Sequence, residues 1–489
     1  MPTVVEALDR AASSWPDRVA WRFDPGRTLT FTEVARDVGR LAAALAADGV
    51  GPGDRVAVLL PNRAEHPLTW LALMRLGAAM VPVNVRYRSA DAAHVLTLTG
   101  ATRVVTDAGS RGVLDELDAP PRVLLVDDLL AAGAPPAPVA VPDEAAVVNV
   151  QMTSGTTGRP KGCLLTHRYW ATIGQGMVDE FPHLGPDDVM LTAQPFSYID
   201  PQWNLVAALL AGAELVVLDG FHPSTFWERV RAHGVTYFYC LAAMPTLLLR
   251  QPPDPADQQH RVRAVQCSAI PPALHAEIEE RWGVPWFEAF GMTETGADLR
   301  VTPLDHDELV GSGCVGAPTA YREARVDPAT GELQLRGAGM MDGYLDDPAA
   351  TEAAFVDGWF RTGDLARLDD EGRVYLVGRL KDMIRRSGEN VAAREVEEVL
   401  LTHTSVRLVA VTGMPDEIRG EEVRAWVVAE GDVDAAALSA HCAERLARFK
   451  VPRYWSFHDD LPRTPSERVE KRRLADLTAD VVDLAAARA

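Results

Sequence analysis

The stretch Thr153-Ser-Gly-Thr-Thr-Gly-Arg-Pro-Lys-Gly162 combines three glycines, four hydroxyl side chains and one lysine in ten positions. Glycine lets backbone N–H groups converge on an anion, the hydroxyls add donors, and Lys161 adds a compact positive charge. Residues 145–152 before it are mostly apolar and predict a buried strand, whereas Thr166 after it is placed to cap a helix beginning at His167. The stretch therefore predicts a phosphate-binding loop.

This loop lacks the spacing of a P-loop NTPase. That motif needs Gly directly before Lys and Ser or Thr after it, but here Pro160 precedes Lys161 and Gly162 follows it. A turn-rich connection without a ligand is the alternative interpretation. The number of hydroxyls and the Pro-Lys-Gly ending favour phosphate binding.

Composition limits the class of protein. A chain of 489 residues is too long for one core. Its formal net charge of −21 argues against nucleic acid or an anionic membrane as a partner. Five scattered cysteines and twelve histidines without metal-ligand spacing predict neither a disulfide framework nor a zinc site. With no signal peptide or membrane span in the sequence, we expect a cytoplasmic protein.

Helical and strand-like segments alternate, as in α/β layered folds. The pattern predicts helices at residues 32–47 and 65–77, strands at 55–60 and 79–85, and further α/β units in residues 203–217, 223–239 and 272–287. After Gly311, short β-like pieces predict a β-rich subdomain, and the final stretch of about a hundred residues predicts a compact α+β unit. We place the domains at residues 1–380 and 381–489.

Four further motifs follow the loop: Phe290-Gly-Met-Thr-Glu-Thr295, Phe360-Arg-Thr-Gly-Asp-Leu365, Gly378-Arg-Leu-Lys-Asp382 and Ser387-Gly-Glu-Asn-Val391. An aromatic face can stack a base, an acid can hold Mg²⁺, and a carboxylate in a turn can accept from ribose hydroxyls. Each motif alone could be a turn or a solvated charge. Their order over most of the chain makes the combination specific.

In this order the motifs resemble the adenylate-forming superfamily of acyl-CoA synthetases, adenylation domains and luciferases, over residues 29–474. Gln251-Pro-Pro, Gly291-Met-Thr-Glu294 and Leu461-Pro-Arg-Thr-Pro465 are most similar to CoA ligases of the carnitine/crotonobetaine type. The resemblance implies an α/β fold, with a large N-terminal domain of two α/β subdomains plus a β-barrel and a small mobile α+β C-terminal domain. It implies ATP, Mg²⁺ and CoA: a carboxylic acid becomes an acyl-adenylate, which CoA then converts to a thioester.

The resemblance also assigns roles to individual residues. The ATP phosphates would be held by Thr153, Ser154, Gly155, Thr156, Thr157, Gly158 and Lys161. The α-phosphate would contact Thr293, Mg²⁺ would bind Glu294, adenine would lie against Ser268, Ala269 and Phe290, and ribose against Asp364 and Arg379. Lys381 takes the hinge position. The loop of Ser387, Gly388 and Glu389 would line the CoA tunnel. Apart from the resemblance, a basic cluster near the C-terminus could attract the CoA phosphates or ATP, and a solvated helix face is the alternative. Its members are Arg445, Arg448, Lys450, Arg453, Arg463, Arg468, Lys471, Arg472 and Arg473.

One motif departs from the family pattern, which is approximately Pro-Arg-Thr-Pro-Thr-Gly-Lys with a lysine that serves adenylation. This chain has Pro462-Arg-Thr-Pro-Ser-Glu-Arg468. Arg is a wide planar fork where Lys is a compact charge, and Glu467 adds negative charge beside a polyphosphate. We therefore expect impaired adenylation of free acid, with a partner enzyme supplying the adenylate. The alternative is a complete two-step ligase in which Arg468 suffices or in which Lys450 or Lys471 replaces the missing lysine.

The acyl pocket is predicted from Tyr198, Trp203 and Gly291, because acetate-specific relatives carry Trp at the Gly291 position. Glycine there would leave room for a bulky, largely apolar acid, of natural-product rather than central metabolism. Two rival functions stay open. Asp200 could hold the amino group of an amino acid in a freestanding adenylation domain that loads a carrier protein. A damaged catalytic loop could also mark a nucleotide-binding pseudoenzyme.

Overall fold

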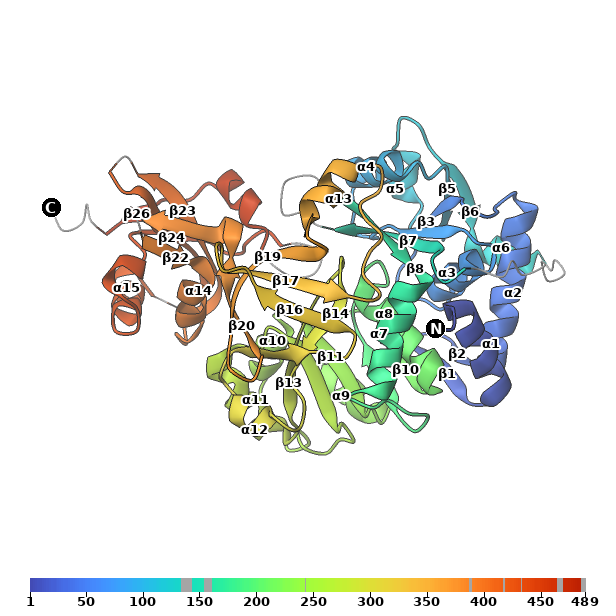
Figure 1. The fold of residues 1–489 in the computed structure, drawn as a ribbon, viewed down its shortest axis with the longest axis horizontal. Coiled ribbons are helices and arrows are strands. Elements are labelled where there is room, and N and C mark those ends of the chain that lie inside the picture. Colours follow the sequence, from blue (N-terminus) through green and yellow to red (C-terminus); the bar gives the residue numbers. More distant parts are fainter. Residues whose placement is uncertain are drawn as a thin grey trace.

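The computed structural model describes residues 1–132, 143–153, 161–241, 243–386, 389–416, 418–431, 433–463 and 469–484. Figure 1 shows a large N-terminal part and a smaller C-terminal unit, which adjoin after β20 (Val374–Arg379). No helix among the described residues has the length and apolar character needed to cross a bilayer.

The first sheet has six strands in the order β6-β5-β3-β4-β7-β8. Its strands are β3 (Arg55–Leu59), β4 (Ala79–Pro82), β5 (Arg103–Thr106), β6 (Arg122–Leu125), β7 (Val147–Thr153) and β8 (Lys161–Thr166). The helices of this part are α1 (Val4–Ser14), α2 (Phe31–Ala47), α3 (Glu65–Arg75), α4 (Ser89–Thr99), α5 (Gly112–Asp115) and α6 (Val126–Ala131). A capping box of Thr30 and Glu33 starts α2 close to the predicted position.

A second, fourteen-stranded sheet combines parallel and antiparallel strands. The parallel strands are β1 (Val19–Asp24), β10 (Glu214–Leu218), β9 (Val189–Thr192), β11 (Tyr237–Leu241), β12 (Ala264–Ser268) and β13 (Trp286–Met292), with β2 (Thr28–Thr30) antiparallel at one edge. The accompanying helices are α7 (His167–Asp179), α8 (Ile199–Ala211), α9 (Phe226–Ala232), α10 (Met244–Leu249), η1 (Pro272–Leu274) and α11 (His275–Trp282). Thr166 caps α7 as predicted, accepting from the backbone N–H of Tyr169.

The β-rich segment predicted after Gly311 begins earlier, at β14, and continues the same sheet from β13. Its antiparallel strands are β14 (Gly296–Arg300), β15 (Cys314–Pro318), β16 (Arg322–Val326), β17 (Glu332–Gly337), β18 (Phe355–Val356), β19 (Trp359–Leu368) and β20. The short helices α12 (His306–Leu309) and α13 (Pro348–Ala354) interrupt it. Between β17 and α13 the chain returns to the phosphate-loop hairpin, because Leu345 N donates to Gly162 O at 2.8 Å and Leu164 N donates to Gly343 O at 2.9 Å.

The C-terminal unit has its own sheet and its own core. Its strands are β21 (Met383–Arg386), β22 (Glu389–Ala392), β23 (Val406–Asp416), β24 (Gly420–Ala429), β25 (Tyr454–Phe457) and β26 (Val482–Asp483). Its helical segments are η2 (Leu380–Asp382), α14 (Ala393–Leu401), α15 (Ala435–Ala443), η3 (Arg448–Lys450) and η4 (Lys471–Asp476). Trp455 is fully buried in the core between this sheet and its helices.

Element types were predicted better than element ends. The strand expected at residues 79–85 ends at Pro82, where its pairing with β3 ends too. The sites predicted for phosphate, adenine and Mg²⁺ all follow the carboxyl ends of strands, namely β7, β12 and β13. Ligands of α/β sheets generally bind outside those ends.

Candidate active site

The phosphate-loop stretch lies between the two strands of a hairpin. Thr153 ends β7, Lys161 begins β8, and the two residues are paired across the antiparallel ladder. The hairpin therefore holds both ends of the loop together. The predicted phosphate-binding residues between those ends lie outside the described residues: Ser154, Gly155, Thr156, Thr157 and Gly158.

The turn between β13 and β14 carries Thr293 and Glu294. The Tyr344 hydroxyl donates to Glu294 Oε1 at 3.1 Å. The Tyr169 hydroxyl donates to the Thr293 carbonyl at 3.0 Å. Two tyrosines from distant parts of the chain therefore fix the turn predicted for the α-phosphate and Mg²⁺.

The surroundings of Glu294 fit a hard divalent cation. Burial raises the pKa of the Glu294 carboxyl, and the Tyr344 hydrogen bond together with the charges of Arg379 and Lys161 opposes that rise. Mg²⁺ takes oxygen ligands and is usually held by one or two carboxylates together with substrate phosphates. By its donor chemistry and its position, Glu294 fits the Mg²⁺ that the resemblance implies.

Gly291 is required by the packing of the hairpin. A Cβ at this position would lie 2.0 Å from Gly296 O and 3.3 Å from Ala297 Cα. The close approach occurs where the β13–β14 register shifts after Phe290. The hairpin of this chain needs glycine at this position whatever acid is bound. Gly291 therefore cannot be used as evidence that the acyl group is bulky.

The segment predicted to flank adenine is tied to β13. Ser268 Oγ donates to Ala289 O at 2.7 Å. Ala269 has a φ of 75°, a conformation rare for a residue with a side chain. The Glu288 carboxylate accepts from the backbone N–H groups of Ala269 and Ile270, each at 2.9 Å. Sequence reasoning missed Glu288, whose only signal was an acid inside an apolar strand.

The residues predicted to bind ribose form a pair between neighbouring strands. Arg379 Nε of β20 donates to Asp364 Oδ1 of β19 at 2.8 Å. Phe290, predicted to face adenine, is half-buried against the core of the antiparallel strands. The pair of Arg379 and Asp364 places a carboxylate and a guanidinium at the end of the large part, next to the hinge.

The hinge position is occupied by Lys381 in η2. Burial lowers the pKa of Lys381, as do the nearby charges of Arg379 and Lys471, and Asp382 opposes this. Lys471 Nζ lies 2.7 Å from Glu397 Oε1 and 3.7 Å from Asp382 Oδ2. The hinge therefore brings Lys381 and Lys471 close together, and Glu397 of α14 neutralises the charge of Lys471.

Most of the catalytic C-terminal motifs lie outside the described residues, namely Ser387, Gly388, Glu467 and Arg468. Glu389 begins β22. Lys450 and Lys471 are the candidate replacements for the lysine missing at position 468. Lys450 Nζ lies 2.6 and 2.7 Å from the two carboxylate oxygens of Glu395. Lys471 is engaged by Glu397 as described.

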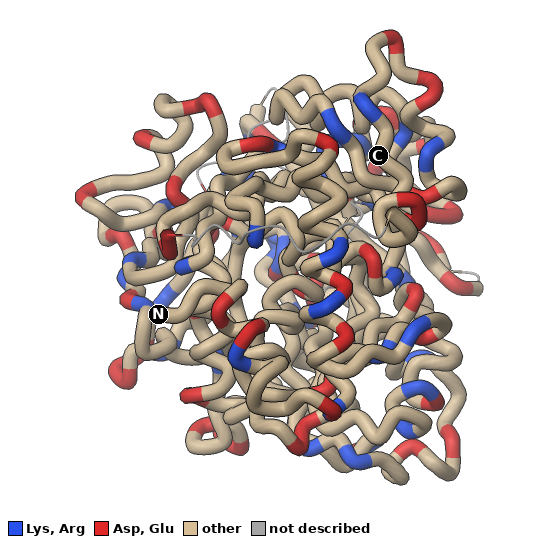
Figure 2. Tube along the Cα trace, turned by 90° about the vertical axis from the view of Figure 1, so that its right-hand side faces the viewer, with Lys and Arg blue, Asp and Glu red and all other residues tan. Residues whose placement is uncertain are grey.

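The basic cluster near the C-terminus is largely neutralised by acids. Its ion pairs in the described part of the chain include Arg445–Glu444, Arg453–Asp483, Arg463–Asp460 and Arg472–Glu470. Over the molecule as a whole, Figure 2 shows acidic and basic positions interspersed along the trace. The predicted attraction of CoA phosphates by unpaired charge is therefore weakened.

The residues predicted for the acyl pocket flank the start of α8. Tyr198 is its N-cap, and the Tyr198 hydroxyl accepts from Asn84 Nδ2 at 3.2 Å. Trp203 is 7% exposed and packs edge-on against Tyr239, with ring centres 5.4 Å apart. The Tyr239 hydroxyl in turn bonds to Ser268 Oγ. An aromatic wall thus connects α8 to the adenine segment.

Asp200 is occupied by neighbours within the protein. Asp200 Oδ2 accepts from Thr192 Oγ1 at 3.0 Å, and Oδ1 accepts from Asn204 Nδ2 at 3.2 Å. The side chain is buried, and burial raises the pKa of Asp200 to about 7. A carboxylate used in this way is poorly placed to hold the amino group of a substrate, which weakens the amino-acid-selecting alternative.

One group of possible metal ligands forms away from these residues: His275, Glu279 and His306. The histidine spacing did not predict it. The Gly311 N–H donates to His275 Nδ1 at 3.2 Å, so Nε2 carries the ring proton and lies 2.8 Å from Trp286 O. That tautomer leaves no lone pair at Nε2 for a metal. The group is better explained as a clamp between α11, β13 and α12.

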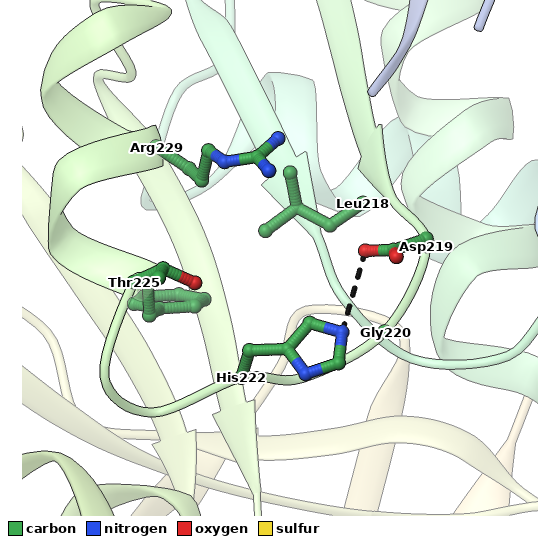
Figure 3. A pocket seen from close by; sticks show the side chains of 7 residues that line it. Leu218, Asp219, Gly220, His222, Thr225 and Arg229 are labelled. Carbon is green, nitrogen blue, oxygen red and sulfur yellow. Dashed lines mark ion pairs between the residues drawn. The ribbon is translucent and has the colours of Figure 1, made fainter. Parts of the chain in front are cut away.

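A small pocket opens after β10 (Figure 3). His222 Nε2 lies 3.5 Å from Asp219 Oδ1, and Arg229 pairs with Asp24. These charges are satisfied within the protein, and no predicted site residue lines the pocket. Its lining comprises Leu218, Asp219, Gly220, His222, Thr225, Phe226 and Arg229.

Comparison with known proteins gives full-length relatives. A sulfoacetate–CoA ligase of Cupriavidus necator is 36% identical over 499 residues, covering 96% of this chain and 97% of the relative. A ligase of Mycobacterium tuberculosis for a 7a-methyl-1,5-dioxo-octahydroindenyl propanoate is 34% identical, and the match covers 97% of this chain and 99% of the relative. A crotonobetaine/carnitine–CoA ligase of Proteus mirabilis is 31% identical, covering 92% and 93%.

Among solved structures, o-succinylbenzoate CoA synthetase of Bacillus subtilis in complex with its acyl-adenylate is 29% identical. It covers 97% of this chain and 98% of that chain, with a TM-score of 0.88. A double mutant of the same enzyme bound to a CoA product analogue covers 97% and 99% at the same identity, with a TM-score of 0.73. The overall structure of this chain is therefore more similar to the acyl-adenylate complex than to the complex with the CoA product analogue.

Two family profiles match the chain. The first, AMP-binding enzyme, spans residues 8–345, and the second, AMP-binding enzyme C-terminal domain, spans residues 395–468. The first alone covers more than half of the sequence. The chain belongs to the AMP-binding enzymes of the adenylate-forming superfamily, among the carboxylic acid–CoA ligases.

Proposed function

We propose that this enzyme forms the CoA thioester of a bulky, largely apolar carboxylic acid and acts mainly on preformed acyl-adenylate, which a partner enzyme supplies. The observation that carries the proposal is Arg468, preceded by Glu467, where the family motif has Gly-Lys. A planar guanidinium fits poorly where one ammonium has to bridge a carboxylate and a phosphate. The negative charge of Glu467 acts against a polyphosphate in the same place.

The distribution of lysine supports this proposal. The chain contains four lysines among 48 basic residues, and two of them are Lys161 and Lys381, at the phosphate-loop and hinge motifs. Lysine is thus retained at two motif positions while position 468 has arginine. The other two, Lys450 and Lys471, would each have to leave a carboxylate of α14 to replace it.

The two half-reactions place different demands on the protein. In adenylation, a carboxylate oxygen attacks the α-phosphorus of ATP and pyrophosphate leaves. In thioesterification, the CoA sulfur attacks the acyl carbon and AMP leaves. Lys161, Thr293 and Glu294 would hold phosphate and cation, while Asp364 and Arg379 would orient ribose. Bound Mg²⁺ would neutralise phosphate charge.

The proposed acyl group rests on the aromatic pair of Trp203 and Tyr239, together with Tyr198 at the start of the same helix, rather than on Gly291. Aromatic side chains offer large apolar contact areas. The acids named for the relatives range from sulfoacetate to a fused-ring propanoate, so the family accepts both small and bulky acids. We expect bulky acids to be used better than acetate, in the cytoplasm and with CoA as the acceptor.

A paired assay on purified protein tests the function. One arm measures pyrophosphate release from ATP with a panel of bulky acids and acetate, and the other measures CoA consumption with the matching acyl-adenylates. We expect turnover with adenylates and little pyrophosphate release. The Glu467→Gly/Arg468→Lys variant should raise pyrophosphate release. Rapid release by the unmodified enzyme would instead establish a complete two-step ligase, and no CoA consumption from adenylates would favour a carrier-loading enzyme or a pseudoenzyme.

A further inference from the structure

A short segment, residues 341–345, crosses the start of β8 and reaches the turn of Glu294. Leu345 N donates to Gly162 O at 2.8 Å, and Leu164 N donates to Gly343 O at 2.9 Å. At its other end, Met341 N donates to Glu294 O at 2.9 Å. We call residues 341–345 the strap, because they join the phosphate-loop hairpin to the turn predicted to bind the cation.

Gly162 is packed tightly by β7 on one side and touches the strap on the other. A Cβ on Gly162 would lie 2.7 Å from Val150 Cγ1 and 3.5 Å from Leu345 Cβ. Real Cβ atoms avoid the shorter of these distances. Val150 of β7 therefore leaves little room for a side chain at Gly162, and the strap lies at ordinary van der Waals distance from the same position.

Tyr344, in the middle of the strap, contacts the two charged residues of the site at once. The Tyr344 hydroxyl donates to Glu294 Oε1 at 3.1 Å. The Lys161 ammonium lies 4.6 Å from the centre of the same ring, within the range of a cation–π interaction. Phenylalanine could supply the second contact but not the first.

We propose that Tyr344 is a positioning residue for nucleotide binding, which sets Glu294 toward the cation through its hydroxyl and Lys161 toward phosphate through its ring. This inference rests on the proposed roles of Lys161 and Glu294. Both charged side chains are flexible, and their ordering before the ligand arrives lowers the entropy cost of binding. Without Tyr344, the ammonium and the carboxylate would be free to pair with each other.

Two variants separate the two contacts. Tyr344→Phe keeps the ring and removes the hydroxyl, whereas Tyr344→Ala removes both. The matched control is Tyr375→Phe, because the Tyr375 hydroxyl also donates to a carboxylate, Asp369 Oδ2 at 3.3 Å, outside the predicted site. Isothermal titration calorimetry measures ATP affinity with EDTA and over a series of Mg²⁺ concentrations. Circular dichroism and the melting temperature of each variant report its folding.

For Tyr344→Phe we expect ATP affinity in EDTA to stay unchanged and the gain in affinity from Mg²⁺ to fall about tenfold, the effect of one hydrogen bond to a charged group. For Tyr344→Ala we expect the same loss and a further weakening in EDTA of about threefold. Tyr375→Phe should match the unmodified protein in both conditions.

Wild-type Mg²⁺ dependence in a folded Tyr344→Phe protein would overturn the positioning role while leaving the proposed function intact. An equal loss in Tyr375→Phe would overturn it as well, because the effect would then be general. If the unmodified protein binds ATP without any response to Mg²⁺, the proposed role of Glu294 fails and the inference falls with it.

Discussion

The two parts of the molecule anchor their predicted catalytic loops in different ways. In the large part, Arg322 and Asp298 form an ion pair with both side chains fully buried, just after the turn of Glu294. In the C-terminal unit, Glu422 is fully buried, but its partner Arg386 is 17% exposed and lies directly before Ser387. The nucleotide side is thus fixed by a fully buried ion pair, and the CoA side by a partly exposed ion pair between two strands of a smaller sheet.

The mobility of the C-terminal unit that the resemblance implies stays a prediction, and this difference is compatible with it. The contacts between the two parts include hydrogen bonds from Arg250 Nη2 to Val406 O at 2.6 Å and from Arg250 Nη1 to Arg407 O at 3.2 Å. By contrast, Lys450 and Lys471 have carboxylate partners on α14 of their own unit. A unit that satisfies its own charges can change its orientation without exposing unpaired charge.

The largest expected effect is on the buried pair of the large part. Besides Asp298, the Arg322 guanidinium donates to Ala338 O at 2.6 Å and to Thr295 O. Arg322→Met would strand the Asp298 carboxylate in the core and should lower the free energy of unfolding by about 3–5 kcal/mol. Urea denaturation measures it. The double variant Arg322→Met/Asp298→Leu should lose less than the single one, and an equal or larger loss would contradict the stranded-charge account.

A smaller effect is expected in the C-terminal unit. Glu422 accepts from Arg386 Nε at 2.6 Å and from Arg386 Nη2 at 3.1 Å. Glu422→Gln should cost about 2 kcal/mol, because these are hydrogen bonds of a charged group. CoA consumption from acyl-adenylate should fall while ATP affinity stays unchanged. The control is Glu444→Gln, whose partner Arg445 lies at the surface; a comparable loss in that variant would argue against an anchoring role.

The clamp of His306 and Glu279 predicts a pH dependence of stability. Burial lowers the pKa of His306, but hydrogen bonds to Glu279 and Asp307 outweigh it and raise the pKa above its usual value. Burial raises the pKa of Glu279, but hydrogen bonds from His275, His306 and the backbone of Trp286 bring it to about 2. The contribution of His306 is complete below about pH 6.5, and that of Glu279 above about pH 4.5.

The clamp should therefore contribute most between these limits. His306→Gln should cost about 1 kcal/mol near pH 5.5, and the cost should shrink as pH rises through the folded pKa of His306. Thermal melts of both proteins across the pH range measure the difference. A difference that grows toward alkaline pH would show that the histidine is not charged in the folded protein.

The smallest effect on stability is expected between the two parts. Arg250→Ala removes two hydrogen bonds to backbone carbonyls but leaves both cores intact, so the change should stay below about 1 kcal/mol. Small-angle X-ray scattering should nevertheless show a broader distribution of orientations of the C-terminal unit. Lys at position 250 is the conservative comparison. An unchanged scattering profile for Arg250→Ala would mean that other contacts set the orientation.

Sequence patterns predicted much of the fold because the signals are local. Apolar periodicity located many of the helices and strands, Thr166 located the start of α7, and the change in texture after Gly311 located the antiparallel strands from β15 onward but missed β14. The sequence patterns failed where the role of a residue depends on its packing against distant segments. The reason for Gly291 lies in the carbonyl of Gly296, and the partners of Asp200 are Thr192 and Asn204.

By itself the sequence determined the family, the order of the motifs and the replacement of lysine by Arg468. Those properties depend on residue types at fixed spacing. Only the tertiary structure decided that Tyr344 joins Glu294 to Lys161 and that Glu288 holds the turn of Ala269. Such contacts link strands far apart in the chain. They follow from how sheets and loops pack together, and no periodicity within one segment encodes them.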